Sequence, residues 1–253
     1  MDVTAVDGTG YTLSAGTVTA NSDPAGTSNI ITLTTAGITG TTATPTVTYG
    51  TAGDTVDTAA NEVANNANAV ASDAVSPTFT ASRTGLNTIV LTFSENVNVT
   101  TIDGSGYALS VGTVTGNTNP AGISNVITLT TSGVTGTSAT PTVTYTILAG
   151  TTTDTLGNEV ANSANAVAAD AVSPTFTAVT SSTTTIIATF SENVNSAADD
   201  AADWAVVGNT VSSISLLDGS GSTLTITLGT PIATNAVPKN PLLPVTNIFI
   251  GKE

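Results

Sequence analysis

An internal repeat of nearly a hundred residues constrains the fold of this 253-residue chain more than any other feature. The block D-T-x-x-N-E occurs twice, and Glu159 in the second copy lies 97 residues after Glu62 in the first. The block F-S-E-N-V-N recurs at the same spacing, so that Glu192 follows Glu95. Repeats of this length are usually whole domains, because the units of solenoid proteins span about 20 to 50 residues. The sequence therefore predicts a string of separate modules.

The module boundaries fall at two A-V-S-P segments, because the residue before a proline favours extended backbone and a proline can begin an edge strand. They divide the chain into residues 1–75, 76–172 and 173–253. We expect the middle module to be complete, since it alone contains every block of the repeat. The first module is expected to lack its opening strands. The third keeps the opening blocks and then diverges into a proline-punctuated, apolar tail.

Short strands are expected throughout the repeat. The segments I-V-L-T-F and V-I-T-L-T alternate between apolar and polar residues, and Thr and Val dominate them, as is typical of half-buried strands. Turn formers such as Asp103-Gly104 separate these segments. About seven short strands in just under a hundred residues is typical of an immunoglobulin-like sandwich. The predicted fold class is therefore all-β, with tandem immunoglobulin-like β-sandwich modules that are incomplete at both ends.

Charge and composition exclude several classes of function. The chain has three Lys and Arg against 18 Asp and Glu, a formal charge of −15 that repels nucleic acid and anionic lipid surfaces. It has no Cys and no His, which excludes disulfides, thiolate nucleophiles, imidazole bases and the usual zinc sites. The longest apolar run near the end, residues 241–250, is far shorter than the roughly 20 residues of a membrane-spanning helix. We therefore expect no nucleic-acid partner, no membrane insertion and no enzymatic activity.

Four motifs together carry a family resemblance. They are T-F-S-E-N-V-N after an S-P-T-F opening, D-W-A-V-V-G-N-T-V, P-T-V-T-Y and D-T-L-G-N-E-V-A-N. In combination they resemble the bacterial and archaeal immunoglobulin-like repeats of S-layer proteins, giant cell-surface proteins and biofilm adhesins. The first copy departs from the second in one turn, where Ala60 replaces Gly157, and left-handed backbone is less favourable for alanine. The resemblance implies an extracellular or cell-surface location.

Two functions are compatible with this resemblance. One is a non-enzymatic structural component of a cell surface, an S-layer or a filament. The alternative is a calcium-dependent adhesin region that binds a surface glycan, a protein or ice. The connections between the predicted strands are short and aromatic residues make up only 4% of the chain. Because adhesive modules usually carry long loops or exposed aromatics, the structural function is favoured.

Acidic residues recur near the predicted module boundaries and are candidate calcium ligands. Calcium takes about six to eight oxygen ligands, and a chain with few cations leaves its carboxylates unpaired unless an ion binds them. The alternative interpretation is that these acids are solvated turn and cap residues. The predicted calcium ligands are Asp57, Glu62, Asp73 and Glu95 for the first boundary and Asp154, Glu159, Asp170 and Glu192 for the second.

A second group of acids, Asp199, Asp200 and Asp203, has the residue types of a catalytic carboxylate pair. Such a pair also needs a concave pocket, which nothing in the sequence indicates. The neighbouring Trp204 is expected to be a core aromatic residue instead of a sugar-stacking platform.

The first and third modules are expected to be incomplete in complementary ways. The first lacks the opening strands of the repeat, and the third lacks its closing strands. The chain is then either a piece of a longer protein or a subunit that lends a strand to the next copy. A head-to-tail contact of this kind does not close and produces filaments. The expected partners are copies of the chain or neighbouring repeats. The candidate strand donor lies within L-L-P-V-T-N-I-F-I, with Val245, Ile248, Phe249 and Ile250 as the inserted residues.

Overall fold

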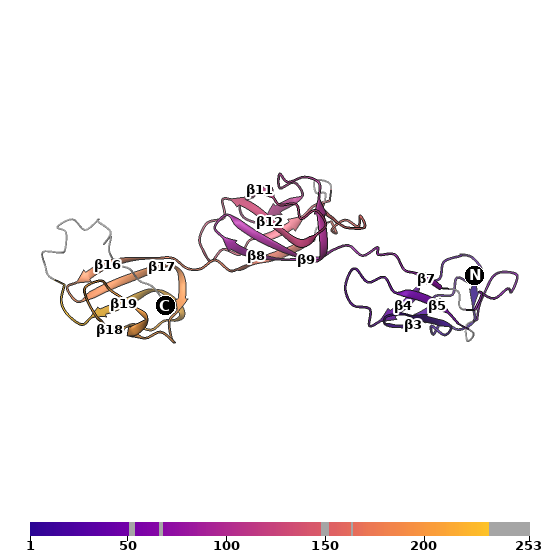
Figure 1. Ribbon diagram of the computed structural model, residues 1–253, viewed down its shortest axis with the longest axis horizontal. Helices are drawn as coiled ribbons and strands as arrows, with labels where there is room; N and C mark the ends of the chain where they lie inside the picture. Colours follow the sequence, from indigo (N-terminus) through magenta and orange to yellow (C-terminus); the bar gives the residue numbers. More distant parts are fainter. Residues whose placement is uncertain (51–53, 66–67, 148–151, 163, 233–253) are drawn as a thin grey trace.

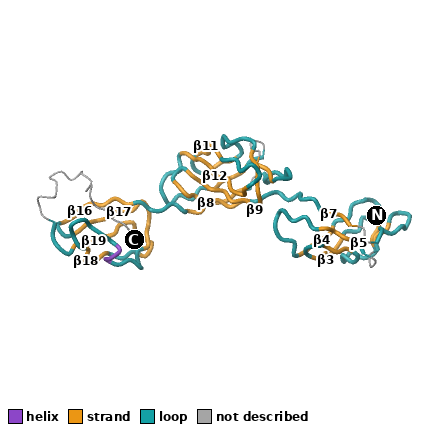
Figure 2. The backbone as a smooth tube through the Cα atoms, viewed as in Figure 1, coloured by secondary structure: helices purple, strands orange, loops and turns teal. Residues whose placement is uncertain are grey.

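The computed structural model describes residues 1–50, 54–65, 68–147, 152–162 and 164–232. Within these residues the regular secondary structure is β strand apart from one short 3-10 helix, which confirms the predicted all-β class. Figure 1 shows the strands gathered in three regions along the long axis of the molecule. Loops join the strands and the regions, as Figure 2 shows. None of the described helical residues forms a helix long and apolar enough to cross a membrane.

The middle region contains the largest sheet. Its strands are β8 (Phe79–Gly85), β9 (Thr88–Val99), β10 (Tyr107–Leu109), β11 (Thr113–Asn117), β12 (Ser124–Ser132), β13 (Thr142–Tyr145), β14 (Thr152–Asp154) and β15 (Asn165–Asp170). Seven of them follow the order β10-β13-β15-β8-β9-β12-β11, and β14 pairs with the end of β9. Every described pair in this sheet is antiparallel except the parallel pair of β15 and β8. The sheet curls into a nearly closed, barrel-like form (Figure 1).

Strand β9 supplies much of the core of this sheet, because successive side chains of a strand point to opposite faces. Ile89 and Leu91 are fully buried, and Phe93 packs on Phe79 with ring centroids 5.4 Å apart. The same alternation carries Glu95 to the inner face, where the side chain is only 7% exposed. A buried carboxylate is unfavourable unless a partner compensates its charge. The fold therefore places one acid where an apolar residue is expected.

The first region has the strands of the same repeat but splits them between three small sheets. Its strands are β1 (Asp2–Val3), β2 (Tyr11–Leu13), β3 (Thr17–Asn21), β4 (Leu33–Ala36), β5 (Thr46–Tyr49), β6 (Thr55–Val56) and β7 (Asn68–Val70). The sheets are β1-β6, β2-β5-β7 and β3-β4. The turn that Ala60 disfavours is nevertheless present, since Ala60 has a φ of 65°.

The third region is a four-stranded sheet with the order β16-β17-β19-β18. Its elements are β16 (Phe176–Ser182), β17 (Thr185–Asn195), the 3-10 helix η1 (Ala201–Asp203), β18 (Val211–Ile214) and β19 (Asp218–Leu228). Trp204 contacts Phe176 and Phe190 edge-on, with ring centroids 6.1 and 6.3 Å away, and packs against the core as expected. Asp200 and Asp203 cap η1 reciprocally through backbone N–H groups, which gives both acids a local structural role.

The predicted strand donor falls outside this description. Val245, Ile248, Phe249 and Ile250 all lie beyond Ile232, the last residue that the structure describes. The donated strand thus stays a prediction.

Candidate metal centre

Three of the eight predicted acids, Asp73, Glu95 and Asp154, come together beside the middle sheet. One carboxylate oxygen of each lies within 4.8 Å of the other two. Asp73 belongs to the segment that connects β7 to β8, whereas Glu95 lies on β9 and Asp154 ends β14. The group therefore joins the connecting segment to the sheet of the following region.

Strand pairing explains why Asp154 reaches this place. Strand β14 runs antiparallel to the end of β9 and sets Asp154 opposite Val97. Glu95 precedes Val97 by two residues and points to the same face, so the two carboxylates become neighbours. Asp73 is fixed by its own turn, in which the carboxylate Oδ1 accepts a hydrogen bond from Val75 N at 2.9 Å.

Asp154 is held by a dense local network and is only 2% exposed. Its Oδ1 accepts hydrogen bonds of 2.8 Å from the backbone N–H groups of Leu156 and Asn158, and its Oδ2 accepts one of 2.7 Å from Asn158 Nδ2. Burial alone raises the pKa of Asp154, but these hydrogen bonds, with one from Gly157, lower the pKa below its usual value. Asp154 is therefore ionised at neutral pH.

Asn158 is a positioning residue that the sequence analysis missed. Its Nδ2 donates to Asp154 and also, at 3.3 Å, to the backbone carbonyl of Asp73. It thereby ties the connecting segment to the end of β14. The signal that could have identified it is the D-T-x-x-N-E block itself, because Asn61 makes the same contacts to Asp57 in the first copy.

Glu95 has an oxygen without a protein partner. Its Oε1 is buried and makes no hydrogen bond to any described residue. Two carboxylates within 4.8 Å of each other repel by about 3 kcal/mol or more at an effective dielectric constant of about 20. The only Lys or Arg side chain in the described part of the chain is Arg83, whose guanidinium donates to the carbonyls of Gly136 and Leu86. A bound cation would compensate both the repulsion and the unpaired oxygen.

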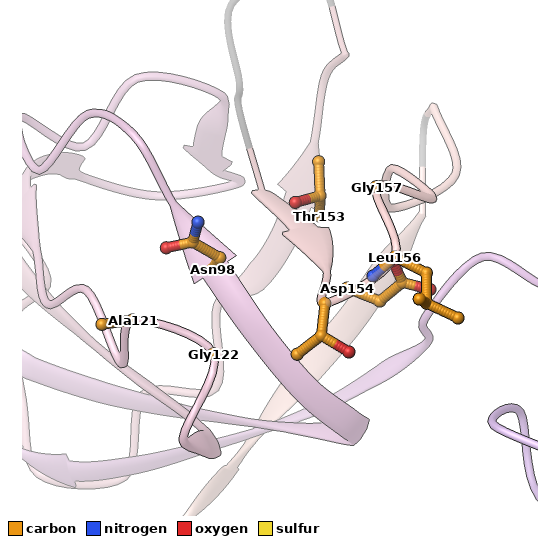
Figure 3. A pocket seen from close by; sticks show the side chains of 8 residues that line it. Asn98, Ala121, Gly122, Thr153, Asp154, Leu156 and Gly157 are labelled. Atoms are coloured by element: carbon orange, nitrogen blue, oxygen red, sulfur yellow. The ribbon is translucent and has the colours of Figure 1, made fainter.

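A cavity of about 540 Å³ opens beside Asp154 and gives solvent access to this end of the sheet. Figure 3 shows Asp154 and Leu156 on one side of it, with Asn98 and the turn at Ala121 and Gly122 on the other. Thr153, Thr155 and Gly157 complete the lining, so no aromatic side chain is among the lining residues. Water molecules in this space could complete the coordination of an ion.

No family model, curated protein or solved structure matches this chain. The resemblance to bacterial and archaeal surface repeats therefore rests on the sequence motifs alone. What the site can bind follows from its donor atoms, which are all oxygens.

The three remaining acids of the D-T-x-x-N-E blocks, Asp57, Glu62 and Glu159, lie in local structure. Asp57 is exposed and accepts hydrogen bonds of 2.8 Å from the N–H groups of Ala59 and Asn61. Hydrogen bonds from the side chain and the backbone of Asn61 lower the pKa of Asp57. Glu62 lies on the exposed surface in a bridge with Val56. Glu159 accepts a hydrogen bond of 3.1 Å from the Tyr145 hydroxyl.

The second boundary repeats part of the centre. Asp170 keeps the turn of Asp73, since its Oδ1 accepts a hydrogen bond from Val172 N at 3.0 Å. Glu192 also has a buried Oε1 without a partner among the described residues. The sequence contains no third D-T-x-x-N-E block, so it offers no counterpart of Asp154 for this boundary. The described residues therefore bring three carboxylates together at the first boundary only.

Proposed function

We propose that this chain is a non-enzymatic structural repeat protein of the cell surface, in which calcium fixes the junction between successive immunoglobulin-like modules. The observation that carries the proposal is the group of three carboxylates. Asp73 belongs to the connecting segment, whereas Glu95 and Asp154 belong to the sheet. An ion bound by all three fastens the segment to the sheet and restricts the angle between neighbouring modules.

The donor atoms favour calcium among the common ions. The chain has no His and no Cys, so the nitrogen and sulfur ligands that zinc and copper prefer are absent from its sequence. Calcium accepts six to eight oxygens in flexible geometry, whereas magnesium requires a near-octahedral site and keeps several of its waters. Three carboxylates, one of which is Glu95 with its unpaired oxygen, match the calcium pattern together with waters from the cavity beside Asp154.

A contact repeated at both junctions supports a regular array. Thr41 Oγ1 donates to Ser94 Oγ at 3.1 Å across the first junction, and Thr137 Oγ1 donates to Ser191 Oγ at 2.9 Å across the second. These residues occupy equivalent positions of the repeat. The two junctions therefore share one contact, which supports a regular array such as a stiff stalk or a lattice component.

The adhesin alternative is less well supported. The feature that would serve it is the cavity beside Asp154, which is large enough for a small polar ligand. Sugar-binding sites usually stack the ring on an aromatic side chain, and none lines this cavity. The structural function is therefore preferred.

Calorimetric titration of the full chain with calcium chloride tests the proposal. We expect a saturable site that prefers calcium to magnesium and that Glu95→Gln abolishes, because the variant keeps the side-chain volume and removes the charge. Solution scattering should show a narrower range of junction angles with calcium than with a chelator. Absence of binding heat together with identical scattering in both buffers contradicts the proposal.

A further inference from the structure

The first and third regions contain complementary parts of the strand order of the middle sheet. Strands β2-β5-β7 correspond to β10-β13-β15, and β16-β17-β19-β18 correspond to β8-β9-β12-β11. The registers agree as well, since Ile89 pairs with Leu129 and Ile186 pairs with Ile226, each residue 97 positions later. Placed side by side, the two partial sheets give the complete seven-strand order.

A single parallel pair of strands would join the partial sheet of the first region to that of the third. In the middle sheet β15 and β8 pair in parallel, with Ala169 beside Ser82. The equivalent residues are Ser72, which follows β7, and Val179 on β16. Among the described residues β7 pairs only with β5, and β16 pairs only with β17. Correspondingly β7 ends at Val70, whereas β15 continues to Asp170.

Both open edges expose a valine and carry few charges. Val179 is 57% exposed on β16, and Val70 is 69% exposed on β7. β16 contains no charged residue, and Asp73 is the only charged residue among residues 68–73. Edge strands that avoid pairing usually carry charges or prolines. In a chain of charge −15, a second copy can approach these two edges without close repulsion between like charges, because Asp73 meets no acid on β16.

We propose that copies of this chain assemble head to tail, with β16 of one copy paired in parallel to residues 71–73 of the next. The register is that of β15 and β8, in which Ala171 N donates to the Arg83 carbonyl at 3.0 Å. The pairing cannot form within one chain, because the middle region separates β7 from β16 (Figure 1). The contact joins two different surfaces and does not close, so repetition produces filaments.

Cysteine cross-linking tests this register, since the chain has no cysteine of its own. Ser72→Cys and Val179→Cys are purified separately, mixed and oxidised. Adjacent strands lie about 4.8 Å apart, within the Cα range of a disulfide. The matched control mixes Ser72→Cys with Ser213→Cys, because Ser213 is exposed on β18.

We expect mixed dimers to form roughly tenfold faster in the test mixture than in the control, because pairing raises the effective thiol concentration. Thr180→Pro added to Val179→Cys should reduce the rate to the control value. The residue equivalent to Thr180 is Arg83, whose carbonyl faces β15, so the proline removes an N–H that faces the open edge. Trp204 fluorescence reports whether that variant folds. Equal rates in both mixtures, with full-length chain that sediments as a monomer at high concentration, overturn the proposal whatever the proline variant does.

The proposed contact shares Asp73 with the calcium site, but the experiment separates the two proposals. Each mixture is oxidised once with calcium and once with chelator. A cross-link that forms without calcium supports assembly even if the metal proposal fails, and a calcium-binding chain that stays monomeric refutes assembly alone.

Discussion

Residues 1–75 and 76–172 contain the same repeat but bury it to different extents. Leu129 and Val143 are 0% exposed in the middle region, whereas the equivalent Leu33 and Val47 are only half-buried. The difference lies in β8 and most of β9, which unite the middle strands into one sheet and have no counterpart among residues 1–75. The comparison teaches that local sequence sets the strands, while one hairpin decides whether they enclose a core.

Local geometry is the same in both regions. Tyr11 and Tyr49 pack with ring centroids 5.3 Å apart, as Tyr107 and Tyr145 do. Tyr49 also accepts a hydrogen bond from a backbone N–H at 2.9 Å, and Tyr145 accepts the equivalent one at 3.0 Å. These tyrosine contacts therefore form in the first region without the hairpin of β8 and β9.

The largest expected effect comes from restoring the hairpin. Residues 1–75 alone should lack cooperative unfolding, because most of their apolar side chains stay half-buried or exposed. With Ser76–Asn96 placed ahead of Met1, the repeat is complete and should unfold cooperatively with a stability of the order of 5 kcal/mol. Thermal melting followed by circular dichroism measures both. Cooperative unfolding of residues 1–75 without the hairpin contradicts the comparison.

A matched pair of core substitutions tests the difference in burial within the full chain. Leu129→Ala should destabilise the middle region by about 3 kcal/mol, because it removes a fully buried side chain and leaves a cavity. Leu33→Ala should cost about 1 kcal/mol or less, since the side chain is already half in solvent. Denaturant unfolding or hydrogen exchange of each region gives the two values. Similar losses at both positions would show that the first region has a closed core.

The stabilisation by calcium should depend on the second copy of the D-T-x-x-N-E block and not on the first. At 100 times its dissociation constant, an ion bound only by the folded state adds about 2.7 kcal/mol. Asp154→Asn should remove that increment, because Asp154 meets Asp73 and Glu95. Asp57→Asn is the control, since Asp57 has the same local turn and no described acid partners in the metal group. Calorimetric melting with calcium and with chelator checks both, and an equal loss in the two variants rules against the site.

The strands could be predicted from the sequence, but their partners could not. Alternation in I-V-L-T-F indicates a half-buried strand whatever its neighbours, and β9 contains this segment. The pairing of β14 with the end of β9 depends on residues more than fifty positions apart. No local pattern encodes that contact, so the immunoglobulin-like arrangement stays an expectation while the all-β class is observed.

The same reason limits what the sequence revealed of the site. Repetition and charge identified Asp73, Glu95 and Asp154 among eight candidate ligands. They did not indicate that Asp154 would join the two acids of the first boundary, because β14 returns to β9 across the sheet. The burial of Glu95 could not be predicted for another reason. An acid in an alternating strand is expected to face outward, and only the register of the strand shows that Glu95 faces the core.

The smallest expected effect concerns the one turn that differs between the two blocks. Ala60 has a φ of 65° and its counterpart Gly157 has a φ of 96°, so both adopt the left-handed backbone that disfavours a Cβ atom by about 1 kcal/mol. A Cβ added at Gly157 would meet no atom within 4 Å, so Gly157→Ala measures backbone strain alone and should destabilise the middle region by about 1 kcal/mol. Ala60→Gly should relieve the same strain, but the gain is partly lost because glycine is more flexible in the unfolded chain. Denaturant melts of the single and double variants measure both values. If Gly157→Ala is neutral while calcium affinity falls, the turn acts through the position of Asn158 and not through strain, and the two copies then differ in site geometry instead of in backbone energy.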